Sequence, residues 1–196
     1  MIPFDEMLPG AKFSELHDRV VDLPIEEVWP AALTVTGAEV RTLAPLFALR
    51  GLPAVLRGKQ PPHPVGDGPL LDLFVSEGFI LLQRDEEPVD GRATIIFGAA
   101  GKFWSPTANH PDNFDSPEEF LAFDEPGFAK TVARVEAFAE GDRTRLETET
   151  LVAGTDTRSD AKFAPYWAII RGPSGLIRRS WLAGIDRRAV RMQQSV

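Results

Sequence analysis

Few side chains in this sequence could take part in acid–base or metal chemistry, and they are scattered along the chain. The three histidines are His17, His63 and His110. None of them has a second histidine two or four residues away, the spacing that places two metal ligands side by side. We therefore expect no metal site. A single histidine that meets an acid inside the fold would nevertheless suffice as a general base.

Among the acids, Glu77 is the first candidate for a group inside a cavity, because it lies in a mostly apolar stretch. An outward-facing strand residue is the simpler interpretation. The acidic runs at 85–87 and 118–119 have polar neighbours, and a catalytic carboxylate pair needs apolar surroundings to separate its pKa values. Arg50 and Arg134 are candidate partners for a ligand carboxylate, although an ion pair across a sheet is the simpler role for Arg134.

Two short motifs resemble known site sequences but lack the required spacing. The run Gly172-Pro173-Ser174-Gly175 lacks one spacer of the nucleophile elbow, and no strand precedes it, so we expect Ser174 to cap a helix. The run FGAAGK lacks the four-residue spacing of a phosphate-binding loop, and Phe103 stands where that loop needs Ser or Thr. The catalytic residues, if there are any, stay unknown, and we expect no cofactor.

The composition predicts one domain spanning residues 1–196, since 43% hydrophobic residues suffice for a sizeable core. The chain has no cysteine, which fits a reducing compartment. Its longest apolar runs, such as 79–82, are far below the roughly 18 residues of a membrane span. The N-terminal residues include acids where a secretory signal would be basic. We therefore expect a cytoplasmic protein without stable membrane insertion.

The net charge of −8 is unevenly distributed. Residues 171–196 hold six arginines against one acid, a net +5, so the rest of the chain carries −13. An acidic body repels phosphates, and no aromatic residue interleaves with the arginines. We expect no nucleic-acid partner, and we interpret the arginines as a solvated helix face that pairs with the acidic body.

The elements that must position these side chains are mainly strands. We predict a strand over 14–23 with Leu16 and Val20 on one face, a helix over 24–33, and extended apolar pieces at 70–75 and 79–87. The clearest pattern is the closing hairpin, in which small or apolar residues alternate with charged ones. It predicts a sheet with one face exposed to water and one face covered.

The cover for that face is a long C-terminal helix. We expect Thr157 or Ser159 to cap it, and a break or kink at Gly172-Pro173 because proline lacks an amide hydrogen. After the kink, one apolar face is formed by Trp181, Leu182, Ile185, Ala189 and Met192.

These segments resemble the helix-grip fold of the START-like superfamily, which includes polyketide cyclases/dehydratases and lipid-transfer domains. The similar blocks are GKFWSP, EEFLAFDEPGFAK, RLETETLVAGTD and FAPYWAIIRGPSGLIRRSWLAGI, and the likeness to uncharacterised bacterial members spans roughly residues 14–190. The resemblance implies an α+β fold with a curved antiparallel sheet around a long, kinked C-terminal helix and an internal cavity between them. It brings no catalytic residues.

The leading hypothesis is that a hydrophobic small molecule or lipid binds in this cavity. The candidate lining residues are large aromatic, small and apolar side chains, which are equally compatible with a plain core: Phe79, Phe103, Trp104, Ala133, Val135, Tyr166, Trp167, Trp181, Leu182 and Ile185. One alternative is an enzyme of cyclase or dehydratase type that uses a cavity acid or base. The other is an interaction protein that docks through its basic helix. The sequence leaves the oligomeric state open.

Overall fold

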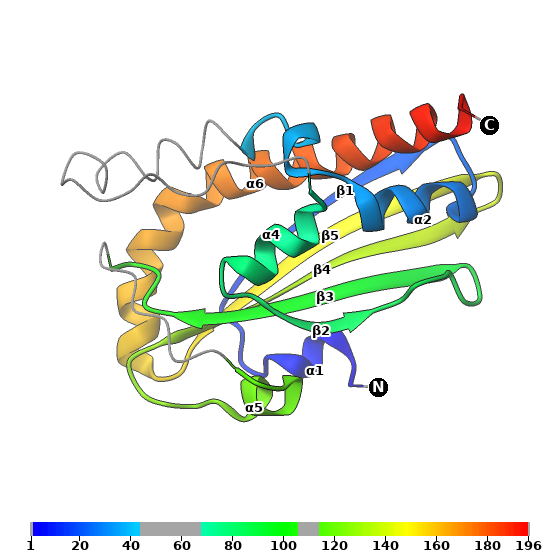
Figure 1. The fold of residues 1–196 in the computed structure, drawn as a ribbon. Helices are drawn as coiled ribbons and strands as arrows, with labels where there is room; N and C mark the ends of the chain where they lie inside the picture. The colour runs from blue at the N-terminus through cyan, green and yellow to red at the C-terminus, as the bar shows by residue number, and fades with distance from the viewer. Residues whose placement is uncertain (1, 44–67, 106–113, 196) are drawn as a thin grey trace.

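The computed structural model describes residues 2–43, 68–105 and 114–195. It is an α+β fold in which a curved five-stranded antiparallel sheet packs against a long C-terminal helix (Figure 1). The helix-grip arrangement expected from the sequence is therefore confirmed.

The sheet has the strand order β1-β5-β4-β3-β2, so the N-terminal strand lies beside the closing hairpin. The closing hairpin turns at Gly141, whose positive φ of 65° favours glycine. The strands are β1 (Phe13–Val21), β2 (Ile80–Arg84), β3 (Arg92–Gly101), β4 (Ala129–Glu140) and β5 (Arg143–Gly154).

The helices lie on both faces of this sheet. One face, which we call the inner face, packs against α2, α4 and α6, and the opposite, outer face packs against α1 and α5 (Figure 1). The helices are α1 (Phe4–Met7), α2 (Ile25–Thr34), the 3-10 turn η1 (Gly37–Glu39), α4 (Leu70–Ser76), α5 (Pro117–Ala122) and α6 (Thr157–Gln193).

The segment 70–75 is helical, so the prediction of an extended piece there was wrong. A short apolar run fits a buried helix as well as a strand, and the flanking residues decide between them. Pro69 precedes the first helical residue, Asp72 lies in the first turn, and Gly78 with a φ of 89° follows the last one. The segment that follows does form β2, as predicted.

The first strand lies where it was expected, with Leu16 and Val20 on one face as predicted. They are 53% and 43% exposed on the outer face, opposite charged residues of β5. Glu15, His17 and Arg19 alternate with them and therefore lie on the inner face. The polar set of this strand thus points inward, together with the buried Val21 at its end.

The C-terminal helix is one continuous α6 that bends instead of breaking (Figure 1). Pro165 and Pro173 both lie inside it, and the N-terminal cap is Asp156, which accepts a hydrogen bond from the Ser159 amide. Of the two alternatives predicted at 172–173, a kink or a break, the break is excluded because the helix is continuous. The caps at Thr157 or Ser159 and the capping role of Ser174 were wrong.

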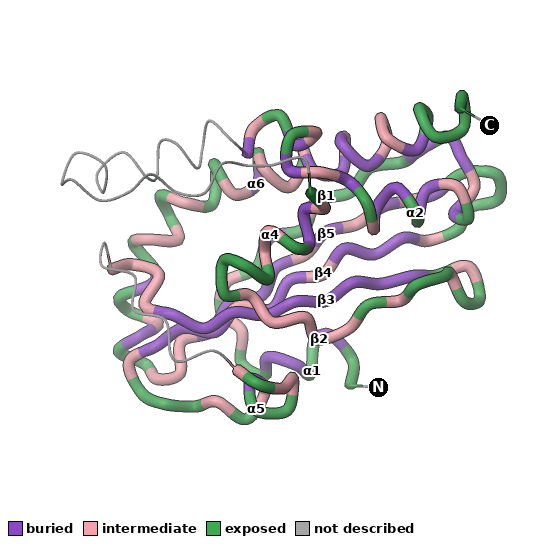
Figure 2. Tube along the Cα trace, viewed as in Figure 1, coloured by how far each residue is buried: buried purple, intermediate pink, exposed green. Residues whose placement is uncertain are grey.

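The predicted apolar face of α6 is confirmed in part. Trp181, Leu182, Ile185 and Ala189 are buried, whereas Met192 near the end of the helix is 39% exposed. The burial pattern in Figure 2 shows the same contrast between the centre of the sheet, which is buried, and the end of α6. The bent helix therefore covers the inner face with its central turns.

Part of the outer face is covered by helices, which corrects the prediction that this face of the sheet is exposed to water. At one end of the sheet, Phe4 of α1 and Phe120 of α5 form an apolar cluster with Val132 of β4. Val132 interrupts the alternation of charged residues with small or apolar ones along the closing hairpin. Its burial in this cluster explains why an apolar residue stands there. Only the remainder of the outer face carries the expected charged residues.

Candidate functional site

A group of polar residues lies on the inner face under the bend of α6, and we call it the inner polar cluster. Glu15 pairs with Thr150 across β1 and β5, and His17 pairs with Thr148 one step along. Arg178 approaches from α6. Because residues opposite each other in an antiparallel pair share a face, the four strand residues all point toward the helix. The cluster consists of Glu15, His17, Thr148, Thr150 and Arg178.

The hydrogen bonds that tie α6 to this cluster come from Arg178. Its Nη1 donates to Thr148 Oγ1 at 3.1 Å, and its Nε to Ser174 Oγ one helical turn earlier at 3.5 Å. Burial lowers the pKa of the Arg178 guanidinium to about 10, although the carboxylate of Glu15 acts in the opposite direction. Arg178 and Glu15 thus partly offset each other's charge inside the fold.

Several polar atoms in and beside the cluster are buried without a hydrogen-bond partner. They are Glu15 Oε2, Thr150 Oγ1 and the indole nitrogen of Trp181, in residues that are 9%, 5% and 2% exposed. His17 Nε2 lies 3.1 Å from Glu15 Oε1, but the two atoms are not aligned for a hydrogen bond. Since most buried polar groups in proteins are paired, such a concentration marks a candidate site.

The helix approaches the cluster closely at Gly175. A β-carbon built at this position would lie 2.5 Å from Glu15 Oε1 and 2.8 Å from His17 Nε2. Glycine is therefore required here by space and not by backbone conformation. The GPSG run that resembled an enzyme motif instead brings the helix onto a buried carboxylate and imidazole.

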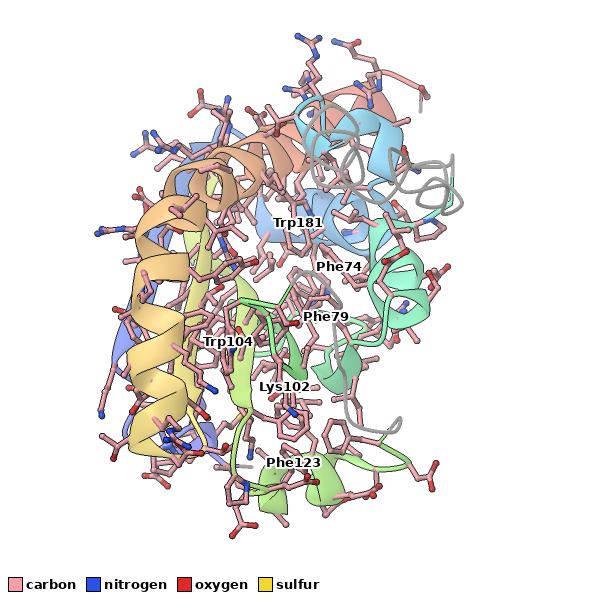
Figure 3. All side chains as sticks on the ribbon, turned by 90° about the vertical axis from the view of Figure 1, so that its left-hand side faces the viewer. Phe74, Phe79, Lys102, Trp104, Phe123 and Trp181 are labelled. Carbon is pink, nitrogen blue, oxygen red and sulfur yellow. The ribbon has the colours of Figure 1, made fainter. Side chains whose placement is uncertain are left out.

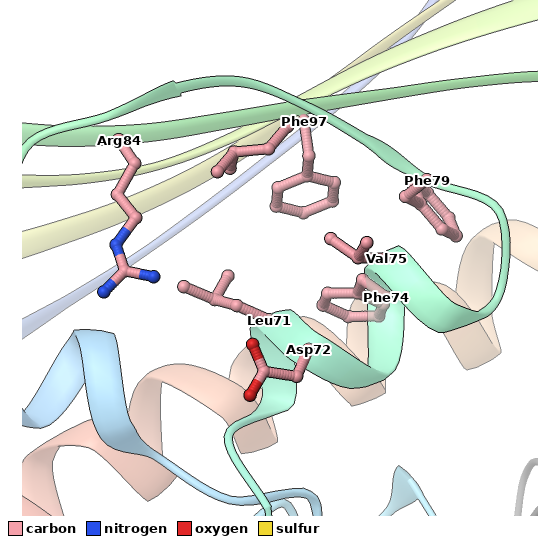
Figure 4. A pocket seen from close by; sticks show the side chains of 8 residues that line it. Leu71, Asp72, Phe74, Val75, Phe79, Arg84 and Phe97 are labelled. Carbon is pink, nitrogen blue, oxygen red and sulfur yellow. The ribbon is translucent and has the colours of Figure 1, made fainter. Parts of the chain in front are cut away.

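Next to the polar cluster lies a small apolar cleft between α4 and the sheet, which we call the α4 cleft. Its volume is about 40 Å³, and Figure 4 shows Phe79 and Arg84 at its two ends. A space of this size holds only a few water molecules. Its lining is Leu71, Asp72, Phe74, Val75, Phe79, Leu81, Arg84 and Phe97.

Aromatic rings join the cleft to α6. Phe74 packs against Phe79, Phe97 and Trp181 with ring centroids 5.2–5.4 Å apart. Figure 3 shows Phe74 and Phe79 near Trp181, whereas Trp104 lies toward the first half of α6. Trp181 therefore packs against two rings that line the cleft, Phe74 and Phe97, and its buried indole nitrogen has no hydrogen-bond partner.

The attachment of α4 is uneven. Its first residue, Leu70, is fully buried and donates its amide to the Val35 carbonyl at 2.8 Å. Val75, near the other end, is 54% exposed. The backbone of α4 stays farther from the sheet than that of α2, so side chains alone fill the space beneath it. In its C-terminal half, Val75 is therefore open to solvent, while Phe74 is held by aromatic contacts to the sheet and α6.

The structure divides the predicted ligand-binding residues into three places. Phe79 lines the α4 cleft, and Trp181 is a core residue that packs against Phe74 of the cleft lining. The others form either the central core or a second aromatic cluster around Phe163 at the opposite end of the inner face. The core members are Ala133, Val135, Leu182 and Ile185, and the second cluster contains Phe103, Trp104, Tyr166 and Trp167.

The remaining candidates lie away from the inner face or outside the described residues. Glu77 is exposed at the end of α4, so its placement in a strand was wrong. Arg134 pairs with Glu136 and Glu149 on the outer face, which confirms its predicted cross-strand role. His63, His110 and Arg50 fall in the segments that the structure does not describe.

Two further observations concern the described residues only. No three His, Cys, Asp or Glu side chains among them are grouped so that they could hold a metal ion. Within the same ranges, none of the helices combines the length and the apolar character needed to cross a lipid bilayer.

Comparisons with known proteins leave the family open. No family model and no curated protein matches the chain. Among solved structures, a hypothetical protein from Helicobacter pylori is 11% identical, with a TM-score of 0.43 over 96% of this chain and 95% of that one. A Thermus thermophilus protein is 13% identical, with a TM-score of 0.33 over 92% and 99%.

Sequence reasoning missed the inner polar cluster because its residues carry no motif. The one available signal was the alternation of Glu15, His17 and Arg19 on a strand whose other face holds Leu16 and Val20. Alternation shows that the two sets lie on opposite faces, but it does not show which face is interior. Only the pairing with β5 reveals that the polar set points inward.

Proposed function

We propose that this protein binds a hydrophobic small molecule between the inner face of the sheet and helices α4 and α6, as members of the START-like superfamily do. The observation that carries the proposal is the α4 cleft, an aromatic space between α4 and the sheet whose lining includes the 54% exposed Val75. Its volume of about 40 Å³ implies that the C-terminal half of α4 moves outward when a ligand enters.

Adjacent leucines on β2 offer a matched test of this proposal. Both are half-buried, but Leu81 lines the α4 cleft and Leu82 packs in the outer-face cluster. Leu81→Trp fills the cleft, so we expect it to weaken binding of the neutral fluorescent probe N-phenyl-1-naphthylamine about tenfold or more. Leu82→Trp adds the same bulk on the other face and should leave the affinity within about twofold.

The readout is a fluorescence titration of each variant, after thermal unfolding has shown that both are folded. Saturable binding that Leu81→Trp weakens and Leu82→Trp does not supports the proposal. Absence of saturable binding to the parent protein, or an equal loss in both variants, contradicts it.

A second candidate function is proton-transfer catalysis of the cyclase or dehydratase type. The observation that favours it is the proximity of buried Glu15 and half-buried His17 on the inner face, where Glu15 Oε1 and His17 Nε2 are 3.1 Å apart. An imidazole beside a carboxylate is a suitable general base. The test is the pH–rate profile for enolisation of an aromatic β-diketone. A rate enhancement that His17→Gln abolishes would establish this activity, and a rate equal to that of buffer would exclude it for this substrate class.

The other expectations stay predictions. A cytoplasmic location, the absence of a nucleic-acid partner and docking through the basic helix all rest on composition and charge. Two arginines of that helix, Arg188 and Arg191, are engaged by Glu39. This pairing leaves less of the basic face for an outside partner.

A further inference from the structure

We propose that the inner polar cluster is a subsite for an uncharged hydroxyl group, so that the ligand is an apolar alcohol or phenol and not a carboxylic acid or an amine. This inference rests on the proposed function, because the hydroxyl enters as the polar end of a molecule whose apolar body occupies the α4 cleft.

The first argument comes from the unpartnered atoms. Glu15 Oε2 accepts hydrogen bonds and the Trp181 indole nitrogen donates them, while the Thr150 hydroxyl can do either. A ligand group that satisfies such a set must both donate and accept. A hydroxyl does both with a single oxygen, whereas an ether or a ketone only accepts.

The second argument comes from charge. The carboxylate of Glu15 and the guanidinium of Arg178 are near enough to influence each other, and Arg178 is held further by Thr148. A ligand carboxylate would add a second negative charge beside Glu15, and a ligand ammonium would add a second positive charge beside Arg178. Like charges in a poorly solvated site repel strongly, so the arrangement favours a neutral group.

The third argument comes from the register of the sheet. Glu15, Thr150, Ala133 and Phe97 lie in one row across β1, β5, β4 and β3, and all point to the inner face. Phe97 belongs to the α4 cleft, so Thr150 is two strands from it, about 10 Å at normal strand spacing. Only the small side chain of Ala133 lies between them in this row. The distance therefore suits a short apolar chain that starts in the cleft and displaces the core side chains around Ala133 to reach the hydroxyl of Thr150.

The test uses four eight-carbon probes that differ only at one end: octane, 1-octanol, octanoate and octylammonium. Each competes with N-phenyl-1-naphthylamine for the parent protein. We expect 1-octanol to compete about tenfold more tightly than octanoate or octylammonium, and more tightly than octane.

Two variants assign the preference to the cluster. Glu15→Gln removes the negative charge, so the preference for 1-octanol over octanoate should fall to within about threefold. Thr150→Val removes one hydroxyl at nearly constant shape, so 1-octanol should lose affinity while octane does not. Thr131→Val is the control, because Thr131 lies on the same face but donates to the Leu151 carbonyl.

The outcomes separate the two proposals. A preference for 1-octanol that Glu15→Gln and Thr150→Val reduce and Thr131→Val leaves intact supports the hydroxyl subsite. Equal competition by all four probes, or a preference that neither variant changes, overturns the subsite but leaves hydrophobic binding in place. Failure of the parent protein to bind the fluorescent probe overturns the proposed function itself.

Discussion

The two faces of the sheet both bury charged residues, but they pair them differently. On the outer face, Glu136 is 1% exposed and accepts hydrogen bonds from Arg92, Arg134 and the Thr94 hydroxyl. Arg134 extends this network to Glu149 at 2.9 Å. On the inner face, Glu15 has one oxygen near His17 and the other without a partner.

This difference indicates which of the two carboxylates, Glu136 or Glu15, contributes to stability. A buried carboxylate with three donors contributes to folding through charge-assisted hydrogen bonds. A buried carboxylate with an unpaired oxygen carries a desolvation cost that the fold does not recover. Uncompensated costs of this kind are typical of functional sites, and the contrast therefore supports the proposed binding role of the inner face.

The largest expected effect compares the two carboxylates directly. Glu136→Gln removes the charge that both Arg92 and Arg134 use, and it should lower the free energy of unfolding by about 3 kcal/mol, as for other buried pairs that lose one partner. Glu15→Gln should change it by less than about 1 kcal/mol, because Glu15 is already incompletely paired. Urea unfolding of both variants measures the two free energies of unfolding. Equal losses of stability would contradict the difference that we infer between the two faces.

The next effect concerns two glycines of α6. Gly175→Ala forces a β-carbon to within 2.5 Å of Glu15 Oε1, and it should destabilise the protein by about 2 kcal/mol despite the better helix propensity of alanine. Gly172→Ala meets nothing within 4 Å and should stabilise it by up to about 1 kcal/mol. Thermal unfolding of both variants gives the sign of each change in stability. A stabilised Gly175→Ala variant would show that α6 does not pack closely against the cluster.

Two buried threonines should respond with opposite signs. Thr150→Val removes a hydroxyl without a partner, and should raise the free energy of unfolding by about 1 kcal/mol. Thr94→Val removes a hydroxyl that donates to Glu136, and should lower it by a similar amount, about 1 kcal/mol. The two residues are 5% and 8% exposed, so burial does not distinguish them. Urea unfolding that gives the same sign for both would contradict the account.

The smallest effect concerns acid stability. Burial tends to raise the pKa of Glu39, but the Thr36 amide and the charges of Arg188 and Arg191 outweigh it and hold the pKa below the ordinary 4.5. A lowered carboxyl pKa stabilises the folded state above 4.5, and this stabilisation is lost as the pH falls through the lowered value.

The corresponding measurement is the free energy of unfolding between about pH 3 and pH 7 for the parent and for Glu39→Gln. We expect the variant to be less stable by about 1 kcal/mol or less at neutral pH, because Arg191 is half exposed and water screens its charge. The two curves should converge at the acidic end. Stability curves that stay parallel over the whole pH range would show that the arginines do not stabilise the ionised form of Glu39.

The sequence was sufficient to predict the architecture, because the closing hairpin and α6 carry regular patterns. Alternation along 130–152 predicted the two strands, and the spacing of Trp181, Leu182 and Ile185 predicted the buried face of the helix. The segment 70–75 was ambiguous, since a short run with five apolar residues and Asp72 fits either element when turn signals flank both ends.

The site was less predictable for a physical reason. Sequence patterns locate apolar faces well, whereas the inner polar cluster places Glu15 and His17 where the pattern expects apolar residues. The bend of α6 illustrates the same limit. Pro173 indicated a break or a kink, and the helix in fact continues through it. Only the packing of α6 against β1 reveals that Gly175 lies on the cluster.

The most direct test of the binding account is the NMR spectrum of the tryptophan indole groups during titration with 1-octanol. The chain has four tryptophans. The Trp29 indole already donates to the Asp85 carbonyl at 2.9 Å and serves as an internal control, whereas the buried Trp181 indole has no partner. We predict that the Trp181 resonance, assigned with Trp181→Phe, shifts saturably downfield while that of Trp29 stays in place. A Trp181 resonance that does not move at saturating 1-octanol, or that moves together with Trp29, would contradict a ligand site between α4, α6 and the inner face.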